Sequence, residues 1–413
     1  MRLGIFTGFL AVSLCCPAAT VRAGYEKAVA GVRVDDLQLG LVDGLLSRDG
    51  RSLSRDGGVE ILLSDNALPM EMFRRAAALP SDGFLLAAKT ERPASRGQGP
   101  DYGPHLKIFR LMLIDARRRA ASGDRAGAEA GLLAAAGFIA QLAEQKAFTL
   151  YGAAALGECA EKAYPFFAES LRGRTPSPSY MRELAVRLGR ALAAMERMPE
   201  LMCAESAELE KNQLRQDLNP EKAVLERGVM PFYRRYAYRR LQNDDYFALV
   251  YSRFDAAADA RASALREAFL RNDPAAAEDF VKGQLRELAA KDARGGKLGV
   301  IGGYKVTVGD AHAVRSGMAD SMVHILTARN AAGYWKIFPV HHSAAARLGL
   351  LRAALAVKEY QRRRGRLPDA LERVVPALLP EIPKDPFNGF APAAYSASPR
   401  GFSLRSGDIV YED

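Results

Sequence analysis

The sequence predicts a mainly α-helical protein. We expect an irregular body of helical hairpins, arranged as a bundle or an α-solenoid, followed by a small C-terminal α+β module. Two observations carry this prediction. Apolar residues recur every three or four positions over much of 104–291, which is typical of helices that bury one face. Residues 344–413 instead combine one helix with short alternating segments that indicate strands.

Length and composition exclude several classes of protein. The chain has 413 residues, of which 49% are hydrophobic and 26% charged, enough for a large core and too many for one small domain. Four cysteines are too few for a disulfide-rich scaffold, and the composition fits neither a collagen nor a protein with several membrane spans. The net charge of +10 makes a polyanion one class of partner to consider.

The N-terminus has the pattern of a secretory signal peptide. Arg2 precedes an apolar run over 3–14, and Val21-Arg22-Ala23 supplies the end of such a leader. We expect cleavage after Ala23 (residues 1–23 removed) and a periplasmic or extracellular location. The mature chain would have 413 − 23 = 390 residues, and its net charge would fall from +10 to +8 because two arginines are lost.

The cysteines divide between the leader and the mature chain. Cys15 and Cys16 would suit a lipoprotein, but such sites have a small residue before the cysteine and Leu14 stands there, so we expect simple cleavage. Cys159 and Cys203 remain in the mature chain. In an oxidising compartment they would form one disulfide, or they would pack as two small buried residues, and the sequence leaves both open.

Residues 24–292 are assigned to the helical domain. Short helices are expected near 42–46 and 70–79, before an exposed loop rich in glycine and proline at 89–103. A hairpin follows, with one helix from Pro104 to about Ser122 and a second capped by Asp124.

The second helix of this hairpin carries the most apolar run of the mature chain. The run at 132–143 is too short to cross a bilayer and is bracketed by Glu129 and Glu144, which predicts a helix buried in a soluble core. Pro165 should kink or break a later helix near Tyr164. Further helices are expected at 147–171, 181–195, 200–216, 220–271 (interrupted near 228–231 and 243) and 274–291.

Residues 293–343 are predicted to be a transition between the two parts. Their glycine-rich start favours a flexible boundary, and Lys297 is followed by leucine, so the P-loop pattern is absent. The alternation at 304–308 predicts a strand, whereas 334–338 fit either a strand or part of a helix.

Residues 344–413 are predicted to form a separate module. A helix over 344–363 is followed by a short second helix to about Pro376 and a turn at Asn388-Gly389. Short strands are expected around Tyr395, 402–404 and 409–411.

This order of elements resembles the globular part of type II secretion major pseudopilins. The motifs that carry the resemblance are Tyr360-x4-Gly365-x2-Pro368, at the end of a long helix, and Leu379-Pro-x-x-Pro-x-Asp-Pro-Phe387, in the loop before a small sheet. The whole chain also looks like bacterial exported proteins in which an Ala/Leu-rich helical body ends in such a module. The resemblance implies a cell-envelope location and no particular activity.

Two features depart from a pseudopilin. Pseudopilins begin with an assembly-competent hydrophobic helix, whereas residues 24–343 intervene here after a leader, so a filament subunit is not expected. The family often holds Ca²⁺ in the loop after the sheet. Asp385 and Asp408 are two possible donors, fewer than the six to eight oxygens of a calcium shell, and Asp385 can equally form a turn before Pro386. We therefore assign no metal or cofactor site.

His341 and His342 are the most conspicuous candidates for chemistry, with His312, His324 and Asp310 upstream. Zinc needs three or four converging ligands, and neither His-Glu-x-x-His nor Cys-x-x-Cys is present. We expect the pair at the surface or at a helix start. The alternative is an exported metal-dependent hydrolase that uses these residues, but no serine-nucleophile motif or carboxylate pair identifies catalytic residues.

Two arginine clusters would suit an anionic surface. In the first, bases alternate with tyrosines over 233–240, as in polyanion-binding surfaces; the simpler interpretation is an amphipathic helix whose tyrosines pack. The second, Arg362–Arg364 with Arg366, complements the dipole at a helix end. Residues of the first cluster that would contact an anionic surface are Arg234, Arg235, Arg239 and Arg240.

From the sequence we therefore expect an exported cell-envelope protein that binds other proteins as an interaction or scaffold component. Nucleic acid is not an expected partner of an exported protein, and no membrane span is expected after removal of the leader. The metal-dependent hydrolase and a polyanion-binding module are the alternatives.

Overall fold

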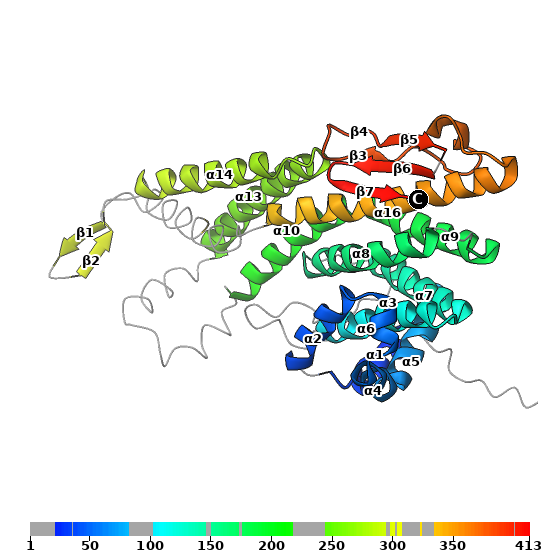
Figure 1. Cartoon of the computed structure of the whole chain (residues 1–413). Coiled ribbons are helices and arrows are strands. Elements are labelled where there is room, and N and C mark those ends of the chain that lie inside the picture. Colours follow the sequence, from blue (N-terminus) through cyan, green and yellow to red (C-terminus); the bar gives the residue numbers. More distant parts are fainter. Residues whose placement is uncertain are drawn as a thin grey trace, which may run out of the picture.

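The structure, a computed structural model, is mainly helical with a small antiparallel sheet near the C-terminus, as the sequence predicts (Figure 1). It describes residues 21–34, 36–81, 102–145, 150–172, 176–217, 244–294, 298–301, 304–307, 323, 334–399 and 401–413.

Five helices form the N-terminal corner of the body. The predicted helices near 42–46 and 70–79 are confirmed, although both begin earlier, and the predicted loop at 89–103 lies almost entirely outside the described residues. Asp49 and Asp56 cap the short third and fourth helices by accepting backbone N–H groups. The helices are α1 (Val21–Gly31), α2 (Asp36–Leu46), α3 (Gly50–Ser54), α4 (Gly57–Asp65) and α5 (Ala67–Ala78).

The predicted hairpin is confirmed as α6 (Gly103–Ala121) and α7 (Arg125–Ala143). Gly123 turns the chain with a φ of 88°, which favours glycine, and Asp124 caps α7 by accepting from the Gly127 N–H at 2.9 Å. Among the described helices, α7 is long and apolar enough to cross a membrane, but 72% of its apolar window is buried inside the protein. It is the core helix that the sequence predicts.

The prediction of a break at Pro165 is wrong, because α8 (Leu150–Leu171) continues through it. Phe166 and Phe167, just beyond the proline, are buried, so packing holds the helix together where one backbone hydrogen bond is lost. The next helix, α9 (Pro178–Met195), begins at Ser177, whose hydroxyl accepts from the Tyr180 N–H.

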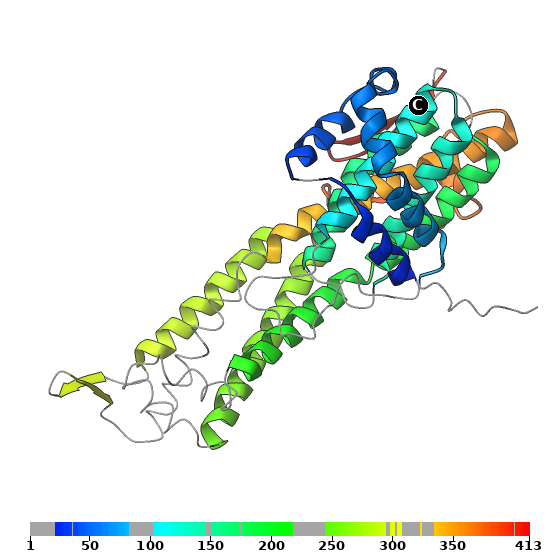
Figure 2. The ribbon, with the colours of Figure 1, turned by 90° about the horizontal axis from the view of Figure 1, so that it is seen from below.

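Three helices extend away from the body as an arm (Figures 1 and 2). They are α10 (Met198–Asp217), α13 (Asp244–Leu270) and α14 (Pro274–Arg294). Strands β1 (Leu298–Ile301) and β2 (Tyr304–Thr307) pair antiparallel beyond them, which confirms the predicted strand at 304–308 and places a strand within the glycine-rich boundary. The arginine cluster at 234–240 lies outside the described residues.

The chain returns to the body through a short 3₁₀ turn, η2 (Tyr334–Lys336), and the long helix α16 (Ile337–Arg364), so 334–338 are helical. A second 3₁₀ turn, η3 (Leu371–Val374), takes the place of the expected short helix. Strands β3 (Lys384–Asp385) and β4 (Ala391–Pro392) form a two-stranded pair. The predicted C-terminal strands are confirmed as the antiparallel meander β5 (Ala394–Ser398), β6 (Gly401–Ser406) and β7 (Ile409–Glu412).

Helix α16 lies at the centre of the molecule. It packs along α8 and α9 on one side, and β6 and β7 cover another of its faces (Figure 1). Leu351 of α16, Leu404 of β6 and Leu188 of α9 are fully buried in one continuous hydrophobic core. The predicted boundary between residues 343 and 344 therefore does not separate two cores, since α16 begins at Ile337 and belongs to both parts.

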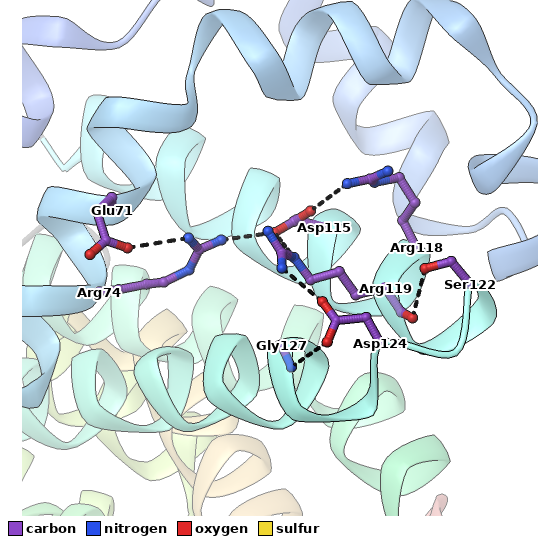
Figure 3. Close-up of polar contacts among 8 residues, drawn as sticks. All are labelled: Glu71, Arg74, Asp115, Arg118, Arg119, Ser122, Asp124 and Gly127. Carbon is purple, nitrogen blue, oxygen red and sulfur yellow. Dashed lines mark hydrogen bonds and ion pairs between the residues drawn. The ribbon is translucent and has the colours of Figure 1, made fainter.

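A buried carboxylate ties the N-terminal helices to the hairpin (Figure 3). The side chain of Asp115, on α6, is only 4% exposed and lies 2.8 Å from Arg74 of α5, 3.3 Å from Arg118 and 2.8 Å from Arg119. Arg119 also contacts Asp124, the cap of α7. Because charges removed from water need partners, this cluster fixes how α5, α6 and α7 meet.

Candidate functional site

A cleft of about 890 Å³ lies where α9, α16 and the proline-rich loop 379–390 meet. Its walls bring together two groups that the sequence analysis treated separately, the histidines 341 and 342 and the loop motif that resembles pseudopilins. Both lie within one site because the first turns of α16 run beside that loop.

The two histidines lie near the start of α16, as one of the two expectations had it, but they are buried, so the expected surface position is wrong. His341 and His342 are 5% and 7% exposed, in the second turn of α16. Both rings contact Phe269 near the end of α13, with ring centroids 4.8 and 5.4 Å away. The arm therefore covers the start of α16, which the sequence of α16 alone cannot show.

Their environment keeps both imidazoles neutral. Burial, and then the neighbouring His342, lowers the pKa of His341 to about 3. Burial also lowers the pKa of His342, although its Nε2–H donates to the Phe269 carbonyl at 2.7 Å and opposes the change. The Nδ1 atom of His341 is buried and has no hydrogen-bond partner within the described structure. A buried nitrogen of this kind can hydrogen-bond to a ligand in the cleft.

No residue set for a metal ion is found where the structure describes the chain. Within the described ranges, no three His, Cys, Asp or Glu side chains converge. His312, His324 and Asp310 lie outside these ranges, so the metal-dependent hydrolase stays a prediction.

Asp385 organises the loop. Its carboxylate accepts hydrogen bonds from the Phe387 N–H, the Ser406 hydroxyl and the Gly407 N–H, at 2.9–3.0 Å. Burial raises the pKa of Asp385, but these donors together outweigh it and the net shift is downward. Asp408 is exposed. Asp385 thus adopts the turn-forming role, and it also fastens the loop to the sheet.

Further contacts hold the same loop against its neighbours. A Cβ at Gly349 of α16 would lie 3.2 Å from Pro383, so the glycine allows the loop to approach closely. The Asn272 side chain donates to the Pro386 carbonyl at 3.1 Å, and the Ala393 N–H donates to the Pro383 carbonyl at 2.7 Å. The loop forms a fixed wall of the cleft.

Arg352 lies at the inner end of the cleft, halfway along α16. Its guanidinium rests against α9, 3.1 Å from where a Cβ at Gly189 would lie. Burial lowers the pKa of Arg352, and the opposite charges of Glu196 and Glu381 partly compensate. No carboxylate among the described residues lies within ion-pair distance of this guanidinium.

A second cavity, of about 340 Å³, continues beyond Arg352 along the same pair of helices. Both cavities are lined by α16, whose lining residues recur at helical spacing from His341 to Arg363. The lining residues of α9 recur in the same way from Pro178 to its C-cap, Glu196. We call the two cavities together, with Arg352 lining both, the α9–α16 trough. At 1.5 Å per residue its walls run for about 27–33 Å.

The lining of the trough is both apolar and charged. Its apolar lining includes Leu192, Leu355, Leu379 and Phe390. Five cations (Arg182, Arg352, Arg362, Arg363 and Lys384) and three anions (Glu196, Glu359 and Glu381) line it, a net charge of 5 − 3 = +2. Arg362 and Arg363 are both occupied by Glu359, at 2.7 and 2.6 Å.

The two cysteines are buried free thiols, Cys159 on α8 and Cys203 on α10. Burial raises the pKa of both, that of Cys203 to about 11. This structure therefore corresponds to the interpretation as small buried residues and not to a disulfide.

Arg352 is not among the site residues predicted from the sequence, although a signal for it is present. Arg352 interrupts the apolar stretch from Leu348 to Val357, where a charge needs a reason. Comparison of the chain with protein-family models, with curated proteins and with solved structures finds no match.

Proposed function

We propose that this protein is an exported component of the bacterial cell envelope that binds an extended segment of another protein in the α9–α16 trough. The observation that carries the proposal is that two cavities lie end to end along α9 and α16 and share Arg352 as a lining residue. An extended chain rises about 3.3 Å per residue, so eight to ten residues would fill this length, whereas a drug-sized compound would occupy only part of it.

The chemistry of the lining supports a peptide segment. Leu192, Leu355 and Phe390 offer apolar contacts to side chains, while cations exceed anions by two among the lining residues. A segment with apolar residues and net negative charge complements both features. The rigid wall at 379–390, fixed by Asp385, would keep the trough open without a partner and so reduce the ordering cost of binding.

The N-terminal sequence supports the location. The predicted cleavage site lies between Ala23 and Gly24, within α1, and a mature chain would keep the buried Tyr25 and Ala28 of that helix. Its partners would then be envelope proteins. Helix α16 packs against β6 and β7 of the three-stranded meander, and this C-terminal part would offer a further surface for such contacts.

The experiment is selection of random 12-residue peptides displayed on phage against the purified protein. We expect enriched peptides with apolar and acidic residues, and we expect their binding to be abolished by Ala193→Trp. Ala193 is an exposed residue of the trough, so the indole would occupy the cleft without entering the core.

Ala130→Trp, at an exposed position on α7, is the matched control and should bind the peptides like the wild type. Absence of any enriched peptide, or enriched peptides that bind Ala193→Trp as well as the wild type, would overturn the proposal.

A further inference from the structure

We infer that Arg352 anchors a carboxylate of the bound segment at the junction of the two cavities, with apolar side chains of the segment on either side of it. This inference rests on the proposed peptide-binding function and specifies the chemistry that the trough recognises.

Among the described residues, the other partly buried arginines have a hydrogen-bond or ion-pair partner, which is a hydroxyl for Arg347 and an amide for Arg261. Within the described structure, five such arginines each contact a carboxylate: Arg74, Arg110, Arg117, Arg119 and Arg190. A guanidinium removed from water loses hydration that a paired anion restores. Arg352 is half-buried and has no such partner in the part of the chain that is described, which leaves its five N–H donors for a ligand.

The position of Arg352 is built by its neighbours. Its guanidinium lies in the space that the missing side chain of Gly189 leaves on α9, and it lines both cavities. Glu196 and Glu381 act on it only from beyond ion-pair distance. A ligand carboxylate at the junction would therefore meet a guanidinium held in one place, which suits two parallel N–H···O bonds.

A second unpartnered group lies further along the trough. His341 lines the cleft and is only 5% exposed. Its Nδ1 atom is buried and has no hydrogen-bond partner among the described residues. From His341 to Arg352 is 11 residues of α16, or about 16 Å. If the carboxylate of an extended segment is held at Arg352, the residue of the segment about five positions away would lie beside this neutral imidazole.

The carboxylate has two possible sources, an acidic side chain within the segment or the C-terminus of a chain. An internal acidic residue would let the segment fill both cavities. A C-terminal carboxylate would end at Arg352, and the segment would then fill only one of them.

The test uses the trough-binding peptides from the phage selection, synthesised with free and with amidated C-termini, and measures their affinity by calorimetry. Arg352→Gln should weaken binding about 10- to 100-fold, the range expected for loss of a charge-assisted pair. Arg352→Lys should recover part of the affinity, because the charge returns without the fork geometry. Arg182→Gln, at an exposed lining residue, is the matched control and should have a much smaller effect.

If an acidic side chain supplies the carboxylate, replacing that residue by its amide should remove the difference in peptide affinity between wild type and Arg352→Gln. If the C-terminus supplies it, amidation of the C-terminus should remove that difference. Peptides that are blocked by Ala193→Trp but bind Arg352→Gln with unchanged affinity would overturn this inference and leave the proposed function intact. Absence of trough-dependent binding would instead overturn the proposed function. Thermal melts of each variant establish that it is folded.

Discussion

The guanidinium of Arg352 lies against Gly189 so closely that a Cβ at that position would be only 3.1 Å from its central carbon. Glycine in a helix interior lowers helix stability, but at this position in α9 it leaves room for the arginine. Gly189 and Arg352 together couple the backbone of α9 to the charge at the middle of the trough.

Gly189→Ala should displace the Arg352 side chain and weaken binding of trough-selected peptides several-fold, while the protein stays folded. Gly283→Ala on α14 is the matched control, because a Cβ there meets nothing within 4 Å. The control should gain about 0.5–1 kcal/mol of stability from helix propensity and bind normally. Calorimetry and denaturant unfolding measure the two effects, and unchanged binding by Gly189→Ala would contradict the coupling.

Buried neutral His341 should make the protein sensitive to acid. Its pKa falls from an ordinary 6.5 to about 3 on folding, so between these values the unfolded chain binds a proton that the native protein does not. Stability from this group is therefore fully present above pH 6.5 and is lost as the pH falls toward 3. The loss approaches about 1.4 kcal/mol per pH unit.

His341→Gln should flatten this dependence. Urea unfolding at several pH values between 7 and 4 measures it for the variant and for the wild type, whose His342 titrates in the same direction. Parallel curves for the two proteins would show that the burial of His341 does not act in this way.

Asp115→Asn should lower stability by about 1–3 kcal/mol, because Arg74, Arg118 and Arg119 would lose the carboxylate that they share. Asp369→Asn removes one partner of an exposed ion pair with Arg373 and should have no measurable effect. Denaturant unfolding compares them, and an equal effect of both variants would speak against a bracing role for the cluster in Figure 3.

The mature protein should contain two unreactive thiols. Cys159 and Cys203 are buried and their pKa values are raised, so alkylation under native conditions should be slow. After unfolding without a reductant, mass spectrometry should find two alkyl groups on each chain. Alkylation that requires prior reduction would instead reveal a disulfide.

Expression of the full sequence in a bacterial host should yield a periplasmic protein that begins at Gly24. Intact mass spectrometry checks the expected 390 residues, and Ala23→Asp should block processing because the leader needs a small residue at that position. A product acylated at Cys15 or Cys16, or an unprocessed cytoplasmic chain, would contradict the assignment.

Local signals in the sequence predict most of the helices and the C-terminal strands. The period of apolar residues and the Asp124 cap locate α6 and α7, and alternation locates β5, β6 and β7. The break expected at Pro165 does not occur, since tertiary packing around Phe166 and Phe167 outweighs the local penalty.

The trough could not be predicted in the same way. Its two walls come from α9 and α16, which are more than 140 residues apart in the chain, and the sequence pattern of each helix alone does not specify its partner. The burial of His341 has the same origin, because the residue that covers it, Phe269, belongs to the arm. The sequence does present His341, the loop motif at 379–387 and the charge of Arg352 within an apolar run, but nothing in it shows that they share one site.

The central position of α16 also constrains when the molecule can become compact. The buried faces of α8 and α9 are covered by a helix that is synthesised more than 140 residues after them, so the body cannot close until residues 337–364 are available. Closure over such a separation is slow compared with local helix formation. A nascent chain would therefore remain open for most of its synthesis, which would suit the export of an unfolded chain that we propose.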